Sequence, residues 1–200
     1  MEYGVVTILG RRIDATATRL CAPIGTISDK DRQQHGISED ATEGQLPFNA
    51  EWSYFANLRD TGPLGAHNAA VEDGFLRSVW AYPRSAPDFS EVERKVPSWG
   101  PWLDTLHLYR RLYPGLDSYK LGDLVRLFEL ETDLAAEARI HCPPPRSKYH
   151  SALYDALASA LLLLRLYDLP ELSAMTLRWL IMESAPSASA RESMGQQDLF

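Results

Sequence analysis

The sequence predicts an α/β fold in which helices cover a mixed β-sheet. Residues 2–20 form two runs rich in Val, Ile and Thr around a Gly-Arg-Arg turn, which is typical of a β-hairpin. From residue 102 onward, apolar residues recur at helical spacing. One strand-helix unit is predicted between these regions. Strands followed by helices favour a sheet with helices packed on it.

The composition is that of an ordinary globular protein. The 200 residues are 45% hydrophobic and 24% charged, which suffices for a buried core in one domain or two small ones. The sequence contains no apolar run of membrane-spanning length and no signal peptide, so we expect a cytoplasmic protein with no membrane partner. Cys21 and Cys142 are far apart and are predicted to be free thiols.

The net charge of −7 disfavours binding of nucleic acid by bulk electrostatics, because neutralising phosphates requires clustered Lys and Arg. The negative net charge does not exclude an enzyme whose bound metal ions contact the phosphate. Divalent cations bound in an acidic site reverse the local sign of the charge.

The elements after the hairpin follow in order. A loop leads into a short helix that is capped by Ser28, with Asp31 three residues on, and that ends near His35. Residues 47–60 are predicted to form a helix with an apolar core face. That face consists of Phe48, Trp52, Phe55 and Leu58. Residues 62–68 are interpreted as a short buried strand that breaks into a helix over 69–82.

The second half of the chain is predicted to be helical. Prolines interrupt residues 83–101, which are therefore expected to form a long surface loop without regular structure. Helices are predicted over 104–113, 119–130, 131–139, 149–168 and 170–184. Residues 185–200 are small and polar and are predicted to be a flexible tail, which leaves residues 1–184 as one domain.

Two polar residues stand at the start of the helix predicted over 149–168. His150 and Asp155 are five residues apart, which is about 140° around a regular helix, so they do not share a face. They flank one site only if His150 lies at the frayed start of the helix while Asp155 projects from its body. The local pattern alone favours a simpler interpretation, a polar helix start.

Several stretches resemble motifs of one enzyme family. Residues 150–156, His-Ser-Ala-Leu-Tyr-Asp-Ala, resemble the H-x-A-x-x-D-A signature of DnaQ-like 3′-5′ exonucleases, the DEDDh branch of the ribonuclease H-like superfamily. Other motifs of the family are matched in the same order by His35–Ile37, Gly65–Leu76, Asp104–Leu106 and Ser118–Leu124. The resemblance covers residues 2 to about 167 and implies a ribonuclease H-like fold for the domain.

The resemblance implies metal-dependent hydrolysis of phosphodiester bonds at the 3′ ends of single-stranded DNA, with RNA ends as the alternative substrate. In this family four carboxylates hold two Mg²⁺ or Mn²⁺ ions, which activate a water and stabilise charge on the attacked phosphate. Oxygen ligands suit these cations. Carried over by motif, His150 is the general base and Asp155 a metal ligand.

The second acidic position departs from the family pattern. Counting forward from His67 and back from Phe75, the family's Asp falls on Glu72 and not on Asp73. One residue is about 100° around a helix, so only one of the two carboxylates can face the metals. We expect Glu72 to be the ligand.

The first acidic motif of the family has no counterpart in the sequence. That motif, Asp-x-Glu on a strand before the hairpin, supplies two of the four carboxylates. Glu129–Thr132 matches it superficially but lies in a helical region and is rejected. The sheet is therefore expected to lack its first strand. Either the true start lies upstream, so that this chain is truncated, or the chain is a degenerate relative; the intact His150 and Asp155 pattern favours truncation.

Substrate contacts are predicted around these positions. His67, Asn68 and Tyr149 neighbour the expected ligands and base and are predicted to touch the terminal nucleotide. The sequence leaves two interpretations for Trp80, Trp99 and Trp102, which are stacking on unpaired bases and packing in the core. For Arg84, Arg94 and Lys95 the two interpretations are contacts to phosphates and solvated surface charges, of which solvated charges are the more common.

The last five residues, Gln196–Phe200, resemble the Q-x-x-L-F peptide by which bacterial replication and repair proteins dock on the sliding clamp. Leu199 and Phe200 would fill an apolar pocket, and Gln196 would hydrogen-bond at its edge. A tail without function is the alternative. Two hypotheses result: a proofreading or repair exonuclease, and a non-catalytic nucleic-acid or clamp-binding module that keeps the fold and docks on a clamp or polymerase.

Overall fold

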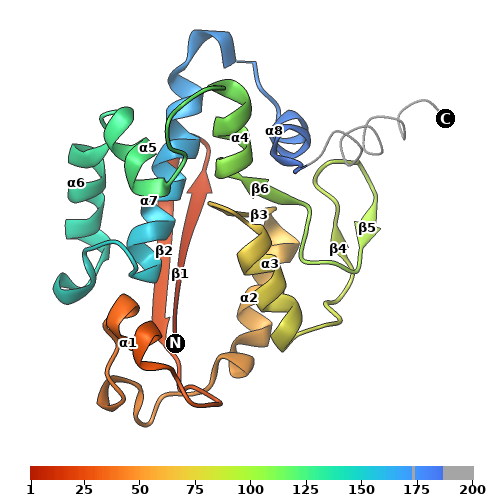
Figure 1. The fold of residues 1–200 in the computed structure, drawn as a ribbon. Helices are drawn as coiled ribbons and strands as arrows, with labels where there is room; N and C mark the ends of the chain where they lie inside the picture. The colour runs from red at the N-terminus through yellow and green to blue at the C-terminus, as the bar shows by residue number, and fades with distance from the viewer. Residues whose placement is uncertain (173, 187–200) are drawn as a thin grey trace. The chain divides into compact units, whose positions relative to one another are not determined.

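A computed structural model describes residues 1–172 and 174–186 (Figure 1). The chain divides into two compact units. Unit 1 comprises residues 1–51 and 121–168, and unit 2 comprises residues 52–120 and the segment from residue 169 onward. Each unit has its own strands and helices, which confirms the α/β class. The boundary at residue 184 between a domain and a tail stays a prediction.

The predicted hairpin opens unit 1. Strands β1 (Glu2–Leu9) and β2 (Arg12–Leu20) pair antiparallel around a two-residue turn, with a bulge at Thr7 and Ile8. Gly10 in the turn has φ 64°, a left-handed conformation that glycine adopts without steric cost. The hairpin is confirmed.

The short helix after the hairpin is also confirmed. In α1 (Asp29–His35) the hydroxyl of Ser28 accepts a hydrogen bond from the backbone N–H of Asp31 at 3.2 Å. Gly36 ends the helix with φ 65°. Two 3₁₀ turns follow in unit 1, η1 (Asp40–Thr42) and η2 (Phe48–Glu51).

Three helices form the core of unit 1 together with the hairpin (Figure 1). They are α5 (Leu121–Leu127), α6 (Glu131–His141) and α7 (Ala152–Arg165), with 3₁₀ turns η3 (Pro144–Arg146) and η4 (Leu166–Asp168). The buried cluster consists of Val125, Leu134, Ala138, Cys142, Leu153, Leu157 and Ala158. Both cysteines are free, as predicted, and both are buried.

The predicted bounds of two of these helices were wrong. The helix expected over 119–130 is confined to α5, and Glu129 beyond it has φ 58°. The helix expected over 149–168 begins only at Ala152, because His150 takes φ 67°, which a right-handed helix does not allow.

Unit 2 is built around a pair of short parallel strands, β3 (Leu64–Ala66) and β6 (Trp102–Asp104). Its helices are α2 (Trp52–Thr61), α3 (Ala70–Val79), α4 (Thr105–Leu112) and α8 (Leu177–Ser184), with a 3₁₀ turn η5 (Pro170–Leu172). The helix predicted over 104–113 begins one residue later, because Asp104 ends β6 and caps α4. The helix predicted over 170–184 is divided into η5 and α8.

The proline-rich segment 83–101 contains regular structure, so that part of the prediction was wrong. Strands β4 (Ala86–Pro87) and β5 (Lys95–Val96) pair antiparallel. Arg59, only 1% exposed, donates hydrogen bonds to the carbonyl oxygens of Ser98 at 3.3 Å, Pro87 at 2.6 Å and Gly100 at 2.5 Å. A buried guanidinium from α2 thus satisfies backbone groups that helices or strands would otherwise pair.

The described strands occur as three two-stranded sheets and not as one continuous sheet. Parallel and antiparallel pairs both occur, as in the predicted mixed arrangement. None of the helices within the described residues is long and apolar enough to cross a membrane.

Candidate active site

His150 and Asp155 meet at the start of α7. His150 precedes the helix in a left-handed conformation, and its backbone N–H donates to Oδ2 of Asp155 at 3.1 Å. Its ring is exposed and makes no hydrogen bond within the described part of the chain. Because His150 lies outside the helix, the 140° separation of a regular helix does not apply, and the two residues flank one place on the surface of unit 1.

The environment of Asp155 favours its neutral form. Removal from water raises the pKa of its carboxyl group to about 6, against a smaller opposing effect of the hydrogen bond from His150. The negative charge of Glu2 acts in the same direction as burial. A cation beside Asp155 would offset this cost, because an opposite charge favours the ionised carboxylate.

Glu2 and Arg146 form a buried ion pair beside this helix start. Arg146 Nε donates to Oε1 of Glu2 at 3.1 Å, and Arg146 Nη2 pairs with Oε2. The backbone N–H of Ala152 donates to Oε2 at 2.8 Å. Sequence reasoning missed both residues, since they are 144 positions apart and share no motif.

The second-motif residues lie at the start of α3 in unit 2. Asn68 precedes the helix with φ 71°, and its side chain is exposed. Glu72 in the first turn is exposed, yet partial removal from water and the nearby Asp104 raise the pKa of its carboxyl group. Asp73 has both oxygens occupied, by Arg77 Nε at 2.6 Å and Trp102 Nε1 at 2.9 Å. This leaves Glu72 as the carboxylate of α3 that is open to a ligand.

His67 is held inside unit 2 by both ring nitrogens. Nε2 lies 2.9 Å from the carbonyl oxygen of Tyr119, so Nε2 carries the proton and donates, and Nδ1 lies 3.0 Å from Thr105 Oγ1. Burial lowers the pKa of His67, which favours the neutral form of the ring. Only the carbon edge of this ring is left for a nucleotide.

The remaining aromatic candidates divide into packed and partly open side chains. Trp99 is 1% exposed, and its indole N–H donates to the carbonyl oxygen of Trp80, which supports packing and not base stacking. The indole N–H of Trp102 is used by Asp73. Tyr149 is half-buried and packs edge-on against Tyr154, with ring centroids 5.1 Å apart.

The described residues do not fit the complete two-ion site of the predicted family. Within residues 1–172 and 174–186, no group of three or more His, Cys, Asp or Glu side chains is placed to hold a metal ion. Both oxygens of Glu2 are used by Arg146 and Ala152. Asp155 in unit 1 and Glu72 in unit 2 each offer a carboxylate, but neither unit by itself assembles a ligand set.

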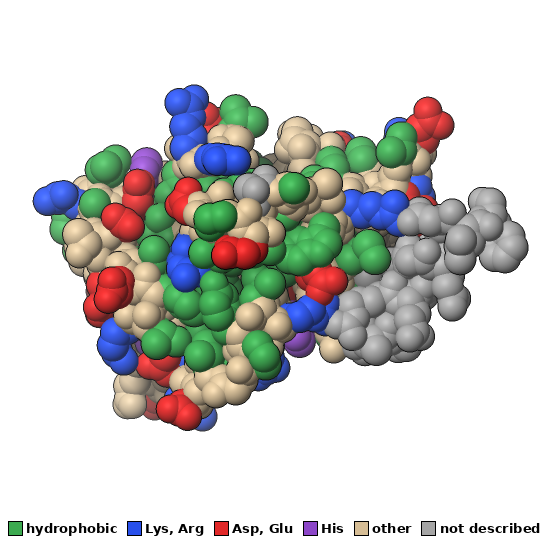
Figure 2. Space-filling model, turned by 90° about the horizontal axis from the view of Figure 1, so that it is seen from above, with side chains coloured by type: hydrophobic (Ala, Val, Ile, Leu, Met, Phe, Trp, Pro, Cys, Tyr) green, Lys and Arg blue, Asp and Glu red, His purple; other side chains and the backbone are tan. Residues whose placement is uncertain are grey.

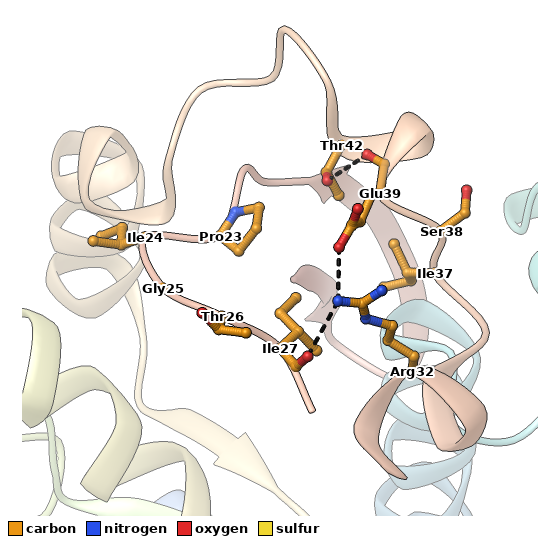
Figure 3. A pocket seen from close by; sticks show the side chains of 10 residues that line it. All are labelled: Pro23, Ile24, Gly25, Thr26, Ile27, Arg32, Ile37, Ser38, Glu39 and Thr42. Atoms are coloured by element: carbon orange, nitrogen blue, oxygen red, sulfur yellow. Dashed lines mark hydrogen bonds and ion pairs between the residues drawn. The ribbon is translucent and has the colours of Figure 1, made fainter. Parts of the chain in front are cut away.

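Neither the surface charges nor the pocket found among the described residues indicates a second site. On the face shown in Figure 2, Lys and Arg side chains alternate with Asp and Glu, without a continuous basic surface. A pocket of about 360 Å³ lies in unit 1 between the loop after β2 and α1 (Figure 3). Its Arg32 is paired with Glu39 at 2.6 Å, and none of the predicted site residues lines it. The tail candidates Gln196, Leu199 and Phe200 lie outside the described residues.

The chain is similar in sequence to parts of large bacterial DNA-processing proteins. It is 26% identical over 166 residues to the PolC-type DNA polymerase III of Halalkalibacterium halodurans, covering 83% of this chain. Over 103 residues, or 52% of this chain, it is 34% identical to the PolC-type DNA polymerase III of Bacillus subtilis. It is 27% identical over 133 residues, or 66% of this chain, to the 3′-5′ exonuclease DinG of Bacillus subtilis.

The matched part is only 10%, 6% and 13% of the length of these three relatives, respectively. In fold, the chain is similar to Exonuclease X in complex with 5′-overhanging duplex DNA, with a TM-score of 0.62 and 23% identity. That alignment covers 92% of this chain and 90% of the other. No family model matches the sequence.

Proposed function

We propose that the chain is a member of the DnaQ-like exonuclease family, with a ribonuclease H-like fold, and that it removes nucleotides from the 3′ end of single-stranded DNA. The observation that carries the proposal is the placement of His150 before α7, beside Asp155. The named activity of DinG supports the choice of reaction, and the DNA bound to Exonuclease X supports DNA as the class of substrate. Proofreading or repair is the corresponding role.

Each candidate residue has a proposed role. His150, with its exposed ring, accepts a proton of the attacking water, and the water oxygen bonds to phosphorus. The bond from phosphorus to the 3′ oxygen of the preceding nucleotide breaks, and that oxygen takes up a proton from solvent. Asp155 and Glu72 are the proposed ligands of Mg²⁺ or Mn²⁺, which in this family neutralise charge on the phosphate. The described residues by themselves do not complete that site. Asn68 and Tyr149 are the proposed contacts to the terminal nucleotide, with His67 limited to its ring edge.

The test is degradation of a 5′-labelled single-stranded oligonucleotide with Mg²⁺ or Mn²⁺, compared with EDTA. We expect a ladder of 3′-shortened products that falls at least about 100-fold in rate in Asp155→Asn and in His150→Ala. Asp133→Asn is the matched control for the first, since Asp133 is an exposed first-turn residue of α6. His141→Ala is the control for the second, since the His141 ring is hydrogen-bonded with Thr16 of β2 and lies beside Glu137.

A ladder that persists unchanged in both site variants would refute the assigned roles. Absence of a ladder from a chain that melts cooperatively would refute the enzymatic proposal. Glu72→Gln against Asp73→Asn then separates the two carboxylates of α3, and we expect only Glu72→Gln to abolish shortening. A loss confined to Asp73→Asn would reverse that assignment.

A second candidate function is binding of nucleic acid without catalysis. It is favoured by the absence of a complete metal-ligand group within residues 1–172 and 174–186. In this case the labelled oligonucleotide would be retained in a gel-shift assay while its length stayed constant in Mn²⁺. Retention together with shortening decides for the exonuclease.

We also propose that Gln196, Leu199 and Phe200 dock on a bacterial sliding clamp or its polymerase partner, as the tail motif predicts. The similarity to DNA polymerase III proteins supports this. Binding of the full chain to the clamp is expected to be lost in Leu199→Ala with Phe200→Ala. Equal binding by this double variant would reject the proposal.

A further inference from the structure

Three segments that are distant in the sequence are joined where α7 begins. The carboxylate of Glu2 at the start of β1 is paired with Arg146 in η3, and the two side chains are only 7% and 15% exposed, respectively. Arg146 also donates from Nη1 to the backbone carbonyl oxygen of His35 at 2.5 Å, at the end of α1. The turn that carries His150 therefore lies between Arg146 on one side and Ala152 on the other.

Glu2 takes the place of the usual helix cap. Ser151 occupies the N-cap position of α7, but its side chain makes no capping hydrogen bond, and its Oγ is buried without a partner in the described structure. Instead, the N–H of Ala152 donates to Glu2 at 2.8 Å. A carboxylate at a helix N-terminus satisfies a free amide and interacts favourably with the helix dipole.

The backbone of the turn needs such support. His150 has φ 67°, a conformation that a residue with a side chain adopts at a cost and keeps only when its surroundings impose it. The surroundings here are the anchored Arg146 and Ala152, and the hydrogen bond from the His150 N–H to Asp155. Loss of either anchor would let the turn relax and move the ring.

We propose that Glu2 and Arg146 are positioning residues, which fix His150 and Asp155 in the geometry for reaction without touching the substrate. The pair also joins the His35–Ile37 turn to the turn of His150, so two of the motifs in the sequence are coupled through one guanidinium. Where catalysis is concerned, the inference rests on the proposed exonuclease function.

The test compares Glu2→Ala and Arg146→Met with a matched control in the same unit. Glu51 is also a buried carboxylate, 9% exposed, paired with Arg19 and hydrogen-bonded by Tyr3, but within the described residues it makes no hydrogen bond to α7. Glu51→Ala therefore reproduces the loss of a buried ion pair without releasing the turn. We expect the two test variants to lose about 10- to 100-fold in kcat with little change in KM, as small misplacements of reacting groups do.

Conservative variants keep the test decisive if the larger changes unfold the chain. Glu2→Gln retains an acceptor for Ala152, and Arg146→Lys retains a charge for Glu2, so both are expected to restore part of kcat. If kcat falls equally in Glu51→Ala at equal loss of thermal stability, the effect is general destabilisation and the proposal is wrong.

Hydrogen exchange separates this proposal from the activity itself. At the Ala152 amide, we expect exchange to rise about tenfold or more in Glu2→Ala and to stay unchanged in Glu51→Ala. This readout holds even if the wild-type chain shows no shortening of DNA, in which case the proposed function fails while positioning of the turn stands. Unchanged protection of Ala152 in Glu2→Ala would overturn the positioning role whatever the activity.

Discussion

The starts of α7 and α3 are built alike although they lie in different units. Each helix follows a non-glycine residue with positive φ, His150 at 67° and Asn68 at 71°. Each carries a candidate carboxylate in its first turn, Asp155 or Glu72. In both, a carboxylate from a distant part of the chain accepts hydrogen bonds from backbone amides at the helix start, since those amides have no partner within the helix.

The two supporting carboxylates differ in what balances their charge. Glu2 is neutralised by one side chain, Arg146. Asp104 accepts from four backbone amides, two at the start of α3 and two at the start of α4. These amides belong to Asn68, Ala69, Leu106 and His107. The carboxylate that caps α7 thus depends on the side chain of Arg146, whereas the carboxylate that caps α3 is held by backbone amides.

The largest effect is expected from removing the shared cap of unit 2. Asp104→Ala leaves four amides without their acceptor, so we expect the free energy of unfolding to fall by about 4 kcal/mol, measured by urea denaturation. Asp104→Asn keeps one acceptor oxygen and is expected to lose about half as much. Asp14, exposed on β2, is the control, and Asp14→Ala is expected to change stability by less than about 0.5 kcal/mol. Equal losses in Asp104→Ala and Asp14→Ala would contradict the capping role.

The next prediction concerns how closely other segments of backbone approach α7 and α3. A Cβ on Gly4 in β1 would lie 2.2 Å from the backbone N of Leu153, so Gly4→Ala forces α7 away from the hairpin. We expect a loss of about 3 kcal/mol and reduced activity, since His150 and Asp155 move with the helix.

Gly74 in α3 is the counterpart, since a Cβ there meets nothing within 4 Å. Gly74→Ala is expected to raise the free energy of unfolding by about 0.5–1 kcal/mol, because alanine favours a helix interior. Thermal melts of the two variants side by side measure the contrast. A stable, active Gly4→Ala chain would show that the packing of α7 on β1 tolerates displacement.

The last effect concerns the two candidate ligands and depends on pH. Because the pKa of Asp155 is raised to about 6, its ionisation costs the folded state free energy, and this cost appears as pH rises from the unfolded value of 3.8 through 6. In EDTA, Asp155→Asn is therefore expected to stabilise the chain by about 1–2 kcal/mol near pH 8 and to change it little near pH 4.

Glu72→Gln provides the comparison from α3. The pKa of Glu72 is raised as well, but its side chain is exposed. We therefore expect Glu72→Gln to stabilise the chain at the higher pH too, but by less than Asp155→Asn does. Urea curves at the two pH values measure both variants. Stabilisation of Asp155→Asn that is larger near pH 4 than near pH 8 would reverse the sign and exclude burial as the cause.

Local patterns predicted the elements whose causes are local. The hairpin at Gly10, the cap of α1 by Ser28 and the core helices followed from residue type and spacing. The sequence analysis did not place Asp104 at the end of a strand. A strand of only three residues directly before a helix is too short to be recognised from its pattern. The β4–β5 pair was missed since its backbone is satisfied by Arg59, which lies 28 residues before Pro87.

For the candidate site, the sequence by itself determined which residues are proposed to carry the chemistry. The motif around residues 150–156 points to His150 as the proposed base and Asp155 as the proposed ligand. Only the tertiary structure decided how they are held. Glu2 and Arg146 meet across 144 residues, and Asp104 reaches Asn68 across 36. Buried charges and free helix amides find their partners by proximity in space, which spacing along the chain does not encode.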